Sequence, residues 1–205
     1  MGGSSESDQL VRLQCPSQSE IEARLGSQDQ PFSYPEVAAT ADLGSPLPES
    51  LAATYDLDRH QFPLGTGRDL FERARSSLVT WRHFDIPWLE IHGATTPVRS
   101  GQVVATLVSV AGLWFLNPCR VVYTELPLDA RNVAAFAYGT LRGHAECGEE
   151  RFVVSFNPVT EEVWYEIAAF SRPAIVLSKL GYPLVRRLQR RFAVSSAQAL
   201  ARAAA

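Results

Sequence analysis

The chain has 205 residues, of which 46% are hydrophobic and 20% are charged. This composition is that of an ordinary globular protein, and it excludes a collagen, a coiled coil, a wholly disordered chain and a disulfide scaffold. The net charge of −3 is unevenly distributed, because residues 1–50 carry −6 and residues 51–205 carry +3. The basic excess gathers at the end of the chain, where seven bases and no acid follow Glu166.

The first ten residues, MGGSSESDQL, lack the basic and apolar regions of a secretory signal. The longest apolar stretch, Val103–Leu116, is too short to cross a bilayer. Three cysteines without regular spacing match neither a disulfide framework nor a zinc ribbon. We therefore expect a cytoplasmic, soluble protein with no transmembrane segment, no metal and no cofactor.

Residues 1–30 are rich in Ser, Gln and Glu, which predicts a disordered acidic and polar tail with a short helix near Ser19–Leu25. Residues 31–205 are expected to form a single α+β domain. Its first part, residues 31–50, has four prolines and scattered apolar residues, and this pattern is typical of an extended arm.

The regular elements begin at a predicted strand, Tyr55–Leu64, which Gly65 closes. Apolar residues at helical spacing then predict an amphipathic helix over Gly67–Arg82. The next eighty residues alternate strand patterns with turn residues. The predicted strands are Trp88–Gly93, Gln102–Phe115, Cys119–Leu126, Asn132–Leu141, Glu150–Asn157 and Glu162–Phe170.

A basic amphipathic helix is predicted over residues 173–205, with Pro173 in its first turn. Gly181 and Pro183 predict a kink or break near Tyr182. The arginines of this helix crowd the faces that its leucine stripe leaves free.

Short connections between successive strands imply antiparallel pairing. The order of strand, helix, six strands and long helix therefore predicts a curved antiparallel sheet of about seven strands that grips the C-terminal helix. This plan is that of the START-like, helix-grip folds, which commonly hold apolar small molecules in a cavity. The step from fold to ligand is an analogy between folds and not an argument about a site.

Several segments together resemble the uncharacterised protein family 0548, which occurs in bacteria and plants. The resemblance covers roughly residues 32–200 and implies a single-domain soluble protein that includes the arm, but it supplies no catalytic residues. The first thirty residues lie outside it. The segments are FSYPEV (Phe32–Val37), GRDLFERA (Gly67–Ala74), NPCRVVY (Asn117–Tyr123), FAYGTLRGHAECGEERF (Phe136–Phe152), VWYEIAAFSRP (Val163–Pro173) and LGYPLVRRLQRRF (Leu180–Phe192).

One face of the strand before the C-terminal helix carries Glu166 between Trp164 and Phe170. A carboxylate among apolar groups needs a partner or takes a raised pKa. Arg120 and Arg151, on other predicted strands, are the natural partners. Three interpretations stay open: a structural ion pair, a group that orients a ligand, and an acid–base residue.

Aromatic residues on the predicted strands offer ring surface with a polar group each, and Tyr123, Tyr138 and Trp164 are candidates to line the cavity. The alternative is that they are ordinary core aromatics. The small residues that alternate with Phe136 and Tyr138 either pack against the C-terminal helix or leave cavity space; they are Ala135, Ala137 and Gly139.

The densest polar cluster, Arg142–Arg151, is predicted to be a loop. His144, Glu149 and Glu150 would then lie at the mouth of the cavity, or in a plain solvated turn. The cluster also includes Cys147, but its spacing matches no known set of metal ligands.

The leading hypothesis is a protein that binds an apolar or amphipathic small molecule between the sheet and the C-terminal helix, through Arg120, Tyr123, Tyr138, Arg151, Trp164, Glu166 and Phe170. Catalysis is not favoured over binding; an enzyme would use the same cavity, with Glu166, Tyr138 or His144 in acid–base roles. A third hypothesis is an interaction module that works through the basic helix. The acidic total charge argues against nucleic acid and leaves peripheral membrane contact open.

Overall fold

The computed structural model describes residues 11–26, 30–42, 47–125, 132–175 and 180–205. Seven strands form one antiparallel sheet in the order β2-β8-β7-β6-β5-β4-β3, and a short β1 pairs with the start of β5. The strands are β1 (Val11–Arg12), β2 (Asp56–Thr66), β3 (Leu89–His92), β4 (Val103–Val110), β5 (Leu113–Glu125), β6 (Val133–Thr140), β7 (Glu146–Phe156) and β8 (Glu162–Pro173).

In the described part of the chain, three α-helices and two 3-10 helices accompany the sheet. They are α1 (Gln18–Leu25), η2 (Glu49–Ala53), α2 (Arg68–Val79), η3 (Arg82–Phe84) and α4 (Tyr182–Ala204). The predicted architecture, a curved antiparallel sheet against a long C-terminal helix, is confirmed. None of the described helices is long and apolar enough to span a membrane.

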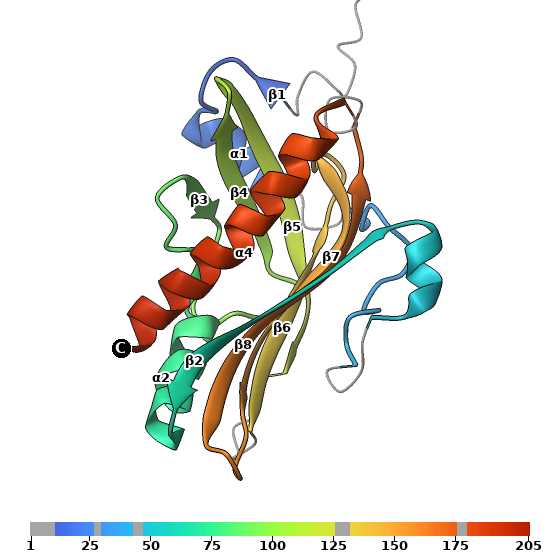
Figure 1. Cartoon of the computed structure of the whole chain (residues 1–205). Coiled ribbons are helices and arrows are strands. Elements are labelled where there is room, and N and C mark those ends of the chain that lie inside the picture. The colour runs from blue at the N-terminus through green and yellow to red at the C-terminus, as the bar shows by residue number, and fades with distance from the viewer. Residues whose placement is uncertain (1–10, 27–29, 43–46, 126–131, 176–179) are drawn as a thin grey trace, which may run out of the picture.

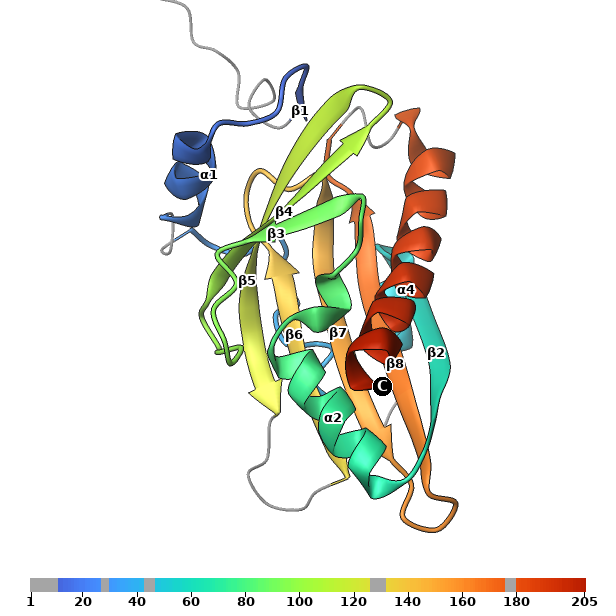
Figure 2. The ribbon, with the colours of Figure 1, turned by 90° about the vertical axis from the view of Figure 1, so that its left-hand side faces the viewer.

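The two faces of the sheet are covered by different parts of the chain (Figure 1). Figure 2 looks onto the inner face, where α2, η3 and α4 lie over the strands. The arm, η2 and α1 cover the outer face. The sheet is therefore the middle layer of three, and it is buried on both sides.

Alternation along β8 assigns each residue to one of these faces. Tyr165 and Ile167 belong to the large core under α2 and α4. Phe170 packs with Tyr34 and Tyr55 under the arm. Glu166 is four residues from Phe170 on the same strand, so the two side chains point to the same face, which is the outer one.

The strand boundaries differ from the prediction between residues 102 and 126. Ala111 and Gly112, both with positive φ, form a hairpin turn that divides the predicted strand Gln102–Phe115 into β4 and the start of β5. Conversely, the predicted turn at Pro118 lies inside β5. The backbone of Pro118 faces Leu141, which lies just beyond the end of β6 and donates its N–H to the Pro118 carbonyl. The N–H that proline lacks is therefore not needed for pairing between β5 and β6.

The predicted loop over residues 142–151 is mostly strand, because β7 begins at Glu146. Glu149 and Glu150 are therefore not loop residues, and they point to opposite faces of the sheet. Pro173 does not start a helix but ends β8, paired with Glu146. The C-terminal helix begins after Gly181, which agrees with the break predicted near Tyr182.

Residues 11–26, expected in the polar tail, contain β1 and α1. The helix predicted near Ser19–Leu25 is confirmed as α1, and Ser17 caps it through a capping box with Glu20. Ile21 buries its side chain against Leu107 and Leu116 on the outer face of β4 and β5. Residues 1–10 and 27–29 of the predicted tail lie outside the described residues.

Candidate functional site

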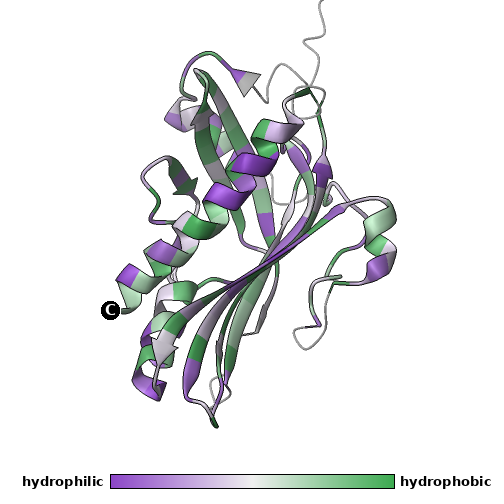
Figure 3. Cartoon of the chain, in the orientation of Figure 1, coloured by the Kyte–Doolittle hydropathy of each residue, from purple (hydrophilic) through white to green (hydrophobic). Residues whose placement is uncertain are grey.

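A cavity of about 340 Å³ lies between the inner face of the sheet and the first half of α4. Most of its wall is apolar. The hairpin of β4 and β5 and the helix α4 contribute aliphatic and aromatic side chains, and η3 with the segment after it contributes two more rings. These residues are Val108, Val110, Leu113, Phe115, Leu184, Val185, Leu188, Phe192, Phe84 and Trp88. Figure 3 shows apolar and polar residues alternating along α4.

The polar part of the wall is a row of side chains across four neighbouring strands. Asp58 of β2 is opposite Ala169 of β8, Ala169 is opposite Glu150 of β7, and Glu150 is opposite Tyr138 of β6. The Tyr138 hydroxyl donates a hydrogen bond of 2.6 Å to Glu150 Oε2. Because Ala169 is small, the space between the two carboxyl groups stays open to the cavity.

Burial controls the protonation of Glu150. Loss of hydration raises the pKa of Glu150 to about 7, the hydrogen bond from Tyr138 opposes this rise, and the charge of Asp58 adds to it. A carboxyl group with this pKa changes between its protonated and its ionised form near neutral pH.

Glu146 is a second carboxyl of the wall, and its side chain is partly buried. Burial raises the pKa of Glu146 to about 7, the nearby Asp56 adds to the rise, and Arg186 and Ser171 oppose it. Its Oε1 atom is buried and accepts no hydrogen bond from the residues that the structure describes.

His144 borders the same end of the cavity. Its Nδ1 accepts a hydrogen bond of 2.9 Å from the backbone N–H of Glu146, so this nitrogen carries no proton. Burial lowers the pKa of His144 to about 4. The imidazole is therefore neutral at pH 7 and adds no positive charge to the wall.

Asp58 is the one carboxyl of the row that has a cationic partner among the described residues. Arg186 of α4 donates two hydrogen bonds to it, of 2.5 and 2.6 Å. The Arg186 guanidinium joins β2 to α4 beside the cavity. No arginine or lysine is among the described residues that line the cavity itself.

The structure places the residues predicted for ligand binding on two different faces. Tyr138 lines the cavity, together with His144 and Glu150, which the sequence predicts at the cavity mouth. Arg120, Tyr123, Arg151, Trp164 and Glu166 are not among its lining residues.

The predicted pairing of Glu166 with Arg151 is confirmed, through a contact of 2.8 Å. Glu166 also accepts hydrogen bonds from Arg59 and Gln61 of β2. Arg120 does not reach Glu166; it donates to the carbonyl of Gln30 and lies over the ring of Phe32.

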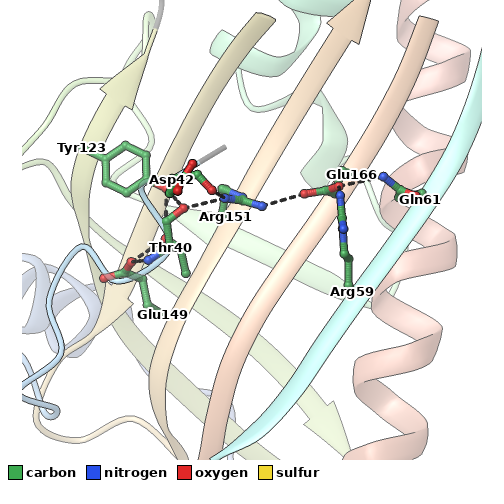
Figure 4. A network of polar contacts seen from close by, with 8 residues as sticks. All are labelled: Thr40, Asp42, Arg59, Gln61, Tyr123, Glu149, Arg151 and Glu166. Atoms are coloured by element: carbon green, nitrogen blue, oxygen red, sulfur yellow. Dashed lines mark hydrogen bonds and ion pairs between the residues drawn. The ribbon is translucent and has the colours of Figure 1, made fainter. Parts of the chain in front are cut away.

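This outer-face network continues into the arm (Figure 4). Arg151, which is 1% exposed, donates to the carbonyl oxygens of Thr40 and Asp42 at 2.7 Å each. The Tyr123 hydroxyl donates to the same Thr40 carbonyl. The charged groups on this face therefore bind the arm to the sheet.

Glu149 and Phe170 form part of the cavity boundary, but their side chains contact the arm. The Glu149 carboxylate accepts hydrogen bonds from the Tyr34 hydroxyl and from the backbone N–H groups of Ala38 and Thr40. The Phe170 ring packs edge-on against Tyr34.

Gly139, together with Ala135 and Ala137, faces the arm and not the C-terminal helix, in contrast to both predicted alternatives. A Cβ atom on Gly139 would lie 1.9 Å from the Tyr34 hydroxyl oxygen, so the small residue allows the arm to approach β6 closely.

Three polar residues near the cavity were not identified from the sequence: Asp58, Glu146 and Arg186. Alternation in β2 places Asp58 on the same face as Phe62, which is a usable signal. Glu146 falls in a stretch that reads as a turn because it contains two glycines, Gly143 and Gly148. Arg186 is one of several arginines on α4, and only the packed helix distinguishes it.

The basic helix offers less free charge than its sequence suggests. Arg186 is paired with Asp58, and Arg191 lies over the Trp88 ring at 4.6 Å. Arg187 and Arg190 are exposed. The hypothesis of an interaction through this helix stays a prediction.

Comparisons with known proteins give similarities along nearly the whole chain. The family described as Domain of unknown function (DUF1990) matches residues 33–199. A UPF0548 protein of Dictyostelium discoideum is 32% identical over 200 residues, which cover 92% of this chain and 93% of that protein. A UPF0548 protein of Deinococcus radiodurans is 34% identical over 206 residues, which cover 95% and 99%.

Among solved structures, a hypothetical protein of Helicobacter pylori is similar with a TM-score of 0.50 and 11% identity, over 75% of this chain and 92% of that one. At this identity the likeness concerns the fold alone. The sequence matches decide the family: this chain belongs to the uncharacterised protein family 0548, and its residues 33–199 match the domain of unknown function DUF1990.

Proposed function

We propose that this protein binds an apolar or amphipathic small molecule in the cavity between the sheet and α4. The observation that carries the proposal is the cavity of about 340 Å³, which has a largely apolar wall and a few polar groups gathered at one part of it. Binding sites for small molecules have this character: apolar surface supplies affinity, and a few placed polar groups supply orientation.

The uncharged dye N-phenyl-1-naphthylamine tests the proposal, because its fluorescence rises in an apolar environment. We expect the purified protein to bind this dye with a micromolar dissociation constant, on the order of 1–10 μM. The variant Ala169→Phe places a ring inside the cavity between Asp58 and Glu150, and we expect it to weaken binding at least about tenfold.

The matched control is Ala201→Phe, which adds the same ring at an exposed position of α4. It should bind the dye like the unmodified protein. Equal binding by both variants, or no binding by the unmodified protein, would contradict the proposed cavity site. Native mass spectrometry of the protein as purified gives a second measurement, since a retained small molecule adds a discrete mass that Ala169→Phe should lose.

A second candidate function, acid–base catalysis in the same cavity, is favoured by the pair of Tyr138 and Glu150. A phenol and a carboxyl group 2.6 Å apart at an apolar wall can pass a proton to a bound molecule. Glu166, which the sequence suggests for such a role, lies on the outer face with Arg151 and Arg59. Catalysis in this cavity would therefore use Glu150 in its place.

A further inference from the structure

The cavity wall has an excess of negative groups that the described residues do not balance. Asp58 has Arg186 as its partner, but Glu146 and Glu150 have no ion-pair partner among the described residues. Each of the two therefore either keeps its proton or carries a charge without compensation, and both states cost free energy in an apolar environment.

The groups around these two carboxyls come from every neighbouring element. Asp56, Asp58 and His60 lie on β2, Tyr138 lies on β6, and His144 precedes β7. Ser171 of β8 is polar but does not titrate, and Arg186 of α4 is already engaged with Asp58. Among the described residues of this set, the one full positive charge is thus engaged with another carboxyl.

The gap over Ala169 gives an independent, geometric reason to expect a donor at this place. Ala169 lies between Asp58 and Glu150 across three neighbouring strands, and all three residues line the cavity. A ligand group that enters this gap meets a carboxyl on each side.

We propose that the ligand of this cavity is an amphipathic amine, with its apolar body against α4 and the β4–β5 hairpin and its protonated nitrogen beside Glu150, at the gap over Ala169. This proposal rests on the proposed function, and it adds the chemical class of the ligand. An ammonium group offers up to three donors and one positive charge, which suits the Glu150 carboxyl and the negative potential of the neighbouring Asp58 and Glu146. An anionic head group would be repelled by the same residues.

The test is a series of three molecules with the same ten-carbon chain: decylammonium, 1-decanol and decanoate. Their binding to the full chain is measured by calorimetry at about pH 8, where both carboxyls are ionised and the amine is still protonated. We expect decylammonium to bind about tenfold more tightly than 1-decanol, and decanoate to bind most weakly.

The pH dependence identifies the carboxyls as the cause. The charge of decylammonium is constant between about pH 5.5 and about pH 8, whereas Glu146 and Glu150 lose their protons over this range. The affinity for decylammonium should therefore rise about tenfold with pH, and the affinity for 1-decanol should stay level.

The double variant Glu146→Gln with Glu150→Gln removes both charges and keeps the side-chain size. We expect it to lose the preference for the amine while its affinity for 1-decanol is unchanged. The control Glu162→Gln, at an exposed position of β8, should keep the preference. If the double variant fails to fold, the pH series on the unmodified protein still decides the question.

Two results would overturn the proposal, and they are distinguishable. If 1-decanol binds as tightly as decylammonium at every pH, the amine assignment is wrong and the proposed cavity site stands. If no member of the series binds, both are wrong.

Discussion

At the scale of the residue, Glu150 is the clearest case of a group held in an unfavourable environment. It lies between Ala169 and Tyr138 on the inner face of the sheet, and it has no cation to stabilise its charge among the described residues. Burial raises its pKa to about 7 from an ordinary value of 4.5. Folding and ionisation of this carboxyl therefore oppose each other in the protein without ligand.

This opposition predicts a stability that depends on pH. Because Glu150 binds its proton more tightly in the folded than in the unfolded state, its contribution is complete below about pH 4.5 and is lost as pH rises through about 7. Glu150→Gln cannot ionise and should be more stable than the unmodified protein by about 2 kcal/mol at pH 8, with little advantage at pH 5.

Urea denaturation at a series of pH values measures this difference. At each pH, the free energy of unfolding of the unmodified protein is subtracted from that of the variant. This difference removes the contributions of the other titrating groups, including His144 and Glu166. Glu162→Gln, which removes an exposed carboxylate, should follow the unmodified protein at every pH. A constant difference between pH 5 and pH 8 would show that Glu150 does not titrate in this range.

At the scale of the element, the arm depends on charged groups buried beneath it. Arg151 binds two arm carbonyls, and Glu149 binds two arm N–H groups and a phenol. Glu166 balances the charge of Arg151 from the neighbouring strand. The arm lacks regular hydrogen bonding of its own over much of its length, so these side chains satisfy backbone groups that would otherwise be unpaired.

Arg151→Met should therefore loosen the arm and destabilise the protein by about 3 kcal/mol, because it removes a donor from two arm carbonyls and the buried cation from Glu166. Arg59→Met removes the other arginine from Glu166, but the Arg59 side chain is 45% exposed, so its loss should cost about 1 kcal/mol or less.

Hydrogen exchange locates the effect of Arg151→Met. The amides of Ala38 and Thr40 should exchange about tenfold faster in this variant, while the centre of β8 keeps its protection. Equal exchange of the arm in the Arg151→Met and Arg59→Met variants would contradict an anchoring role for Arg151.

At the scale of the whole molecule, the two halves of α4 have different surroundings: one packs in the core and the other lines the cavity. The second half buries Ala197, Leu200 and Ala204 in the core with α2 and η3. In the first half, Leu184, Val185 and Leu188 line the cavity. The C-terminal half of the helix therefore packs into the core, whereas the N-terminal half is joined to the edge of the sheet by polar contacts and encloses the cavity with its apolar face.

The same substitution in each half should have unequal effects. Leu200→Ala removes a fully buried side chain and should cost about 3 kcal/mol of unfolding free energy. Leu188→Ala removes a partly exposed side chain from a wall that is already hollow, and it should cost about 1 kcal/mol or less. Thermal and urea unfolding of the two variants compare these costs, and a larger loss for Leu188→Ala would contradict this division of the helix.

Much of the fold follows from local patterns. Period-two alternation and turn residues place most of the strands, helical spacing places α2, and Gly181 with Pro183 marks the start of α4. The pair of Glu166 and Arg151 is also predictable, because a buried carboxylate requires a partner on a neighbouring strand. The hairpin at Ala111–Gly112 is missed because residues 102–115 are almost uniformly apolar and give no contrast in polarity.

The candidate site is predicted less completely, for a reason that lies in the sheet. Alternation along β8 separates Glu166 from Ile167, but it does not say which of the two meets the helix, since both faces are buried. Only the packed structure decides that the arm covers Glu166 and that α4 stands over Ile167 and Ala169.

The sequence by itself determined the family, the class of fold and the residues that share a strand face, because these depend on neighbours along the chain. The tertiary structure alone decided which face holds the cavity and brought Asp58, Glu146 and Glu150 to one wall. Their meeting depends on the strand order β2-β8-β7-β6, which joins segments nearly a hundred residues apart through pairings that no local pattern encodes.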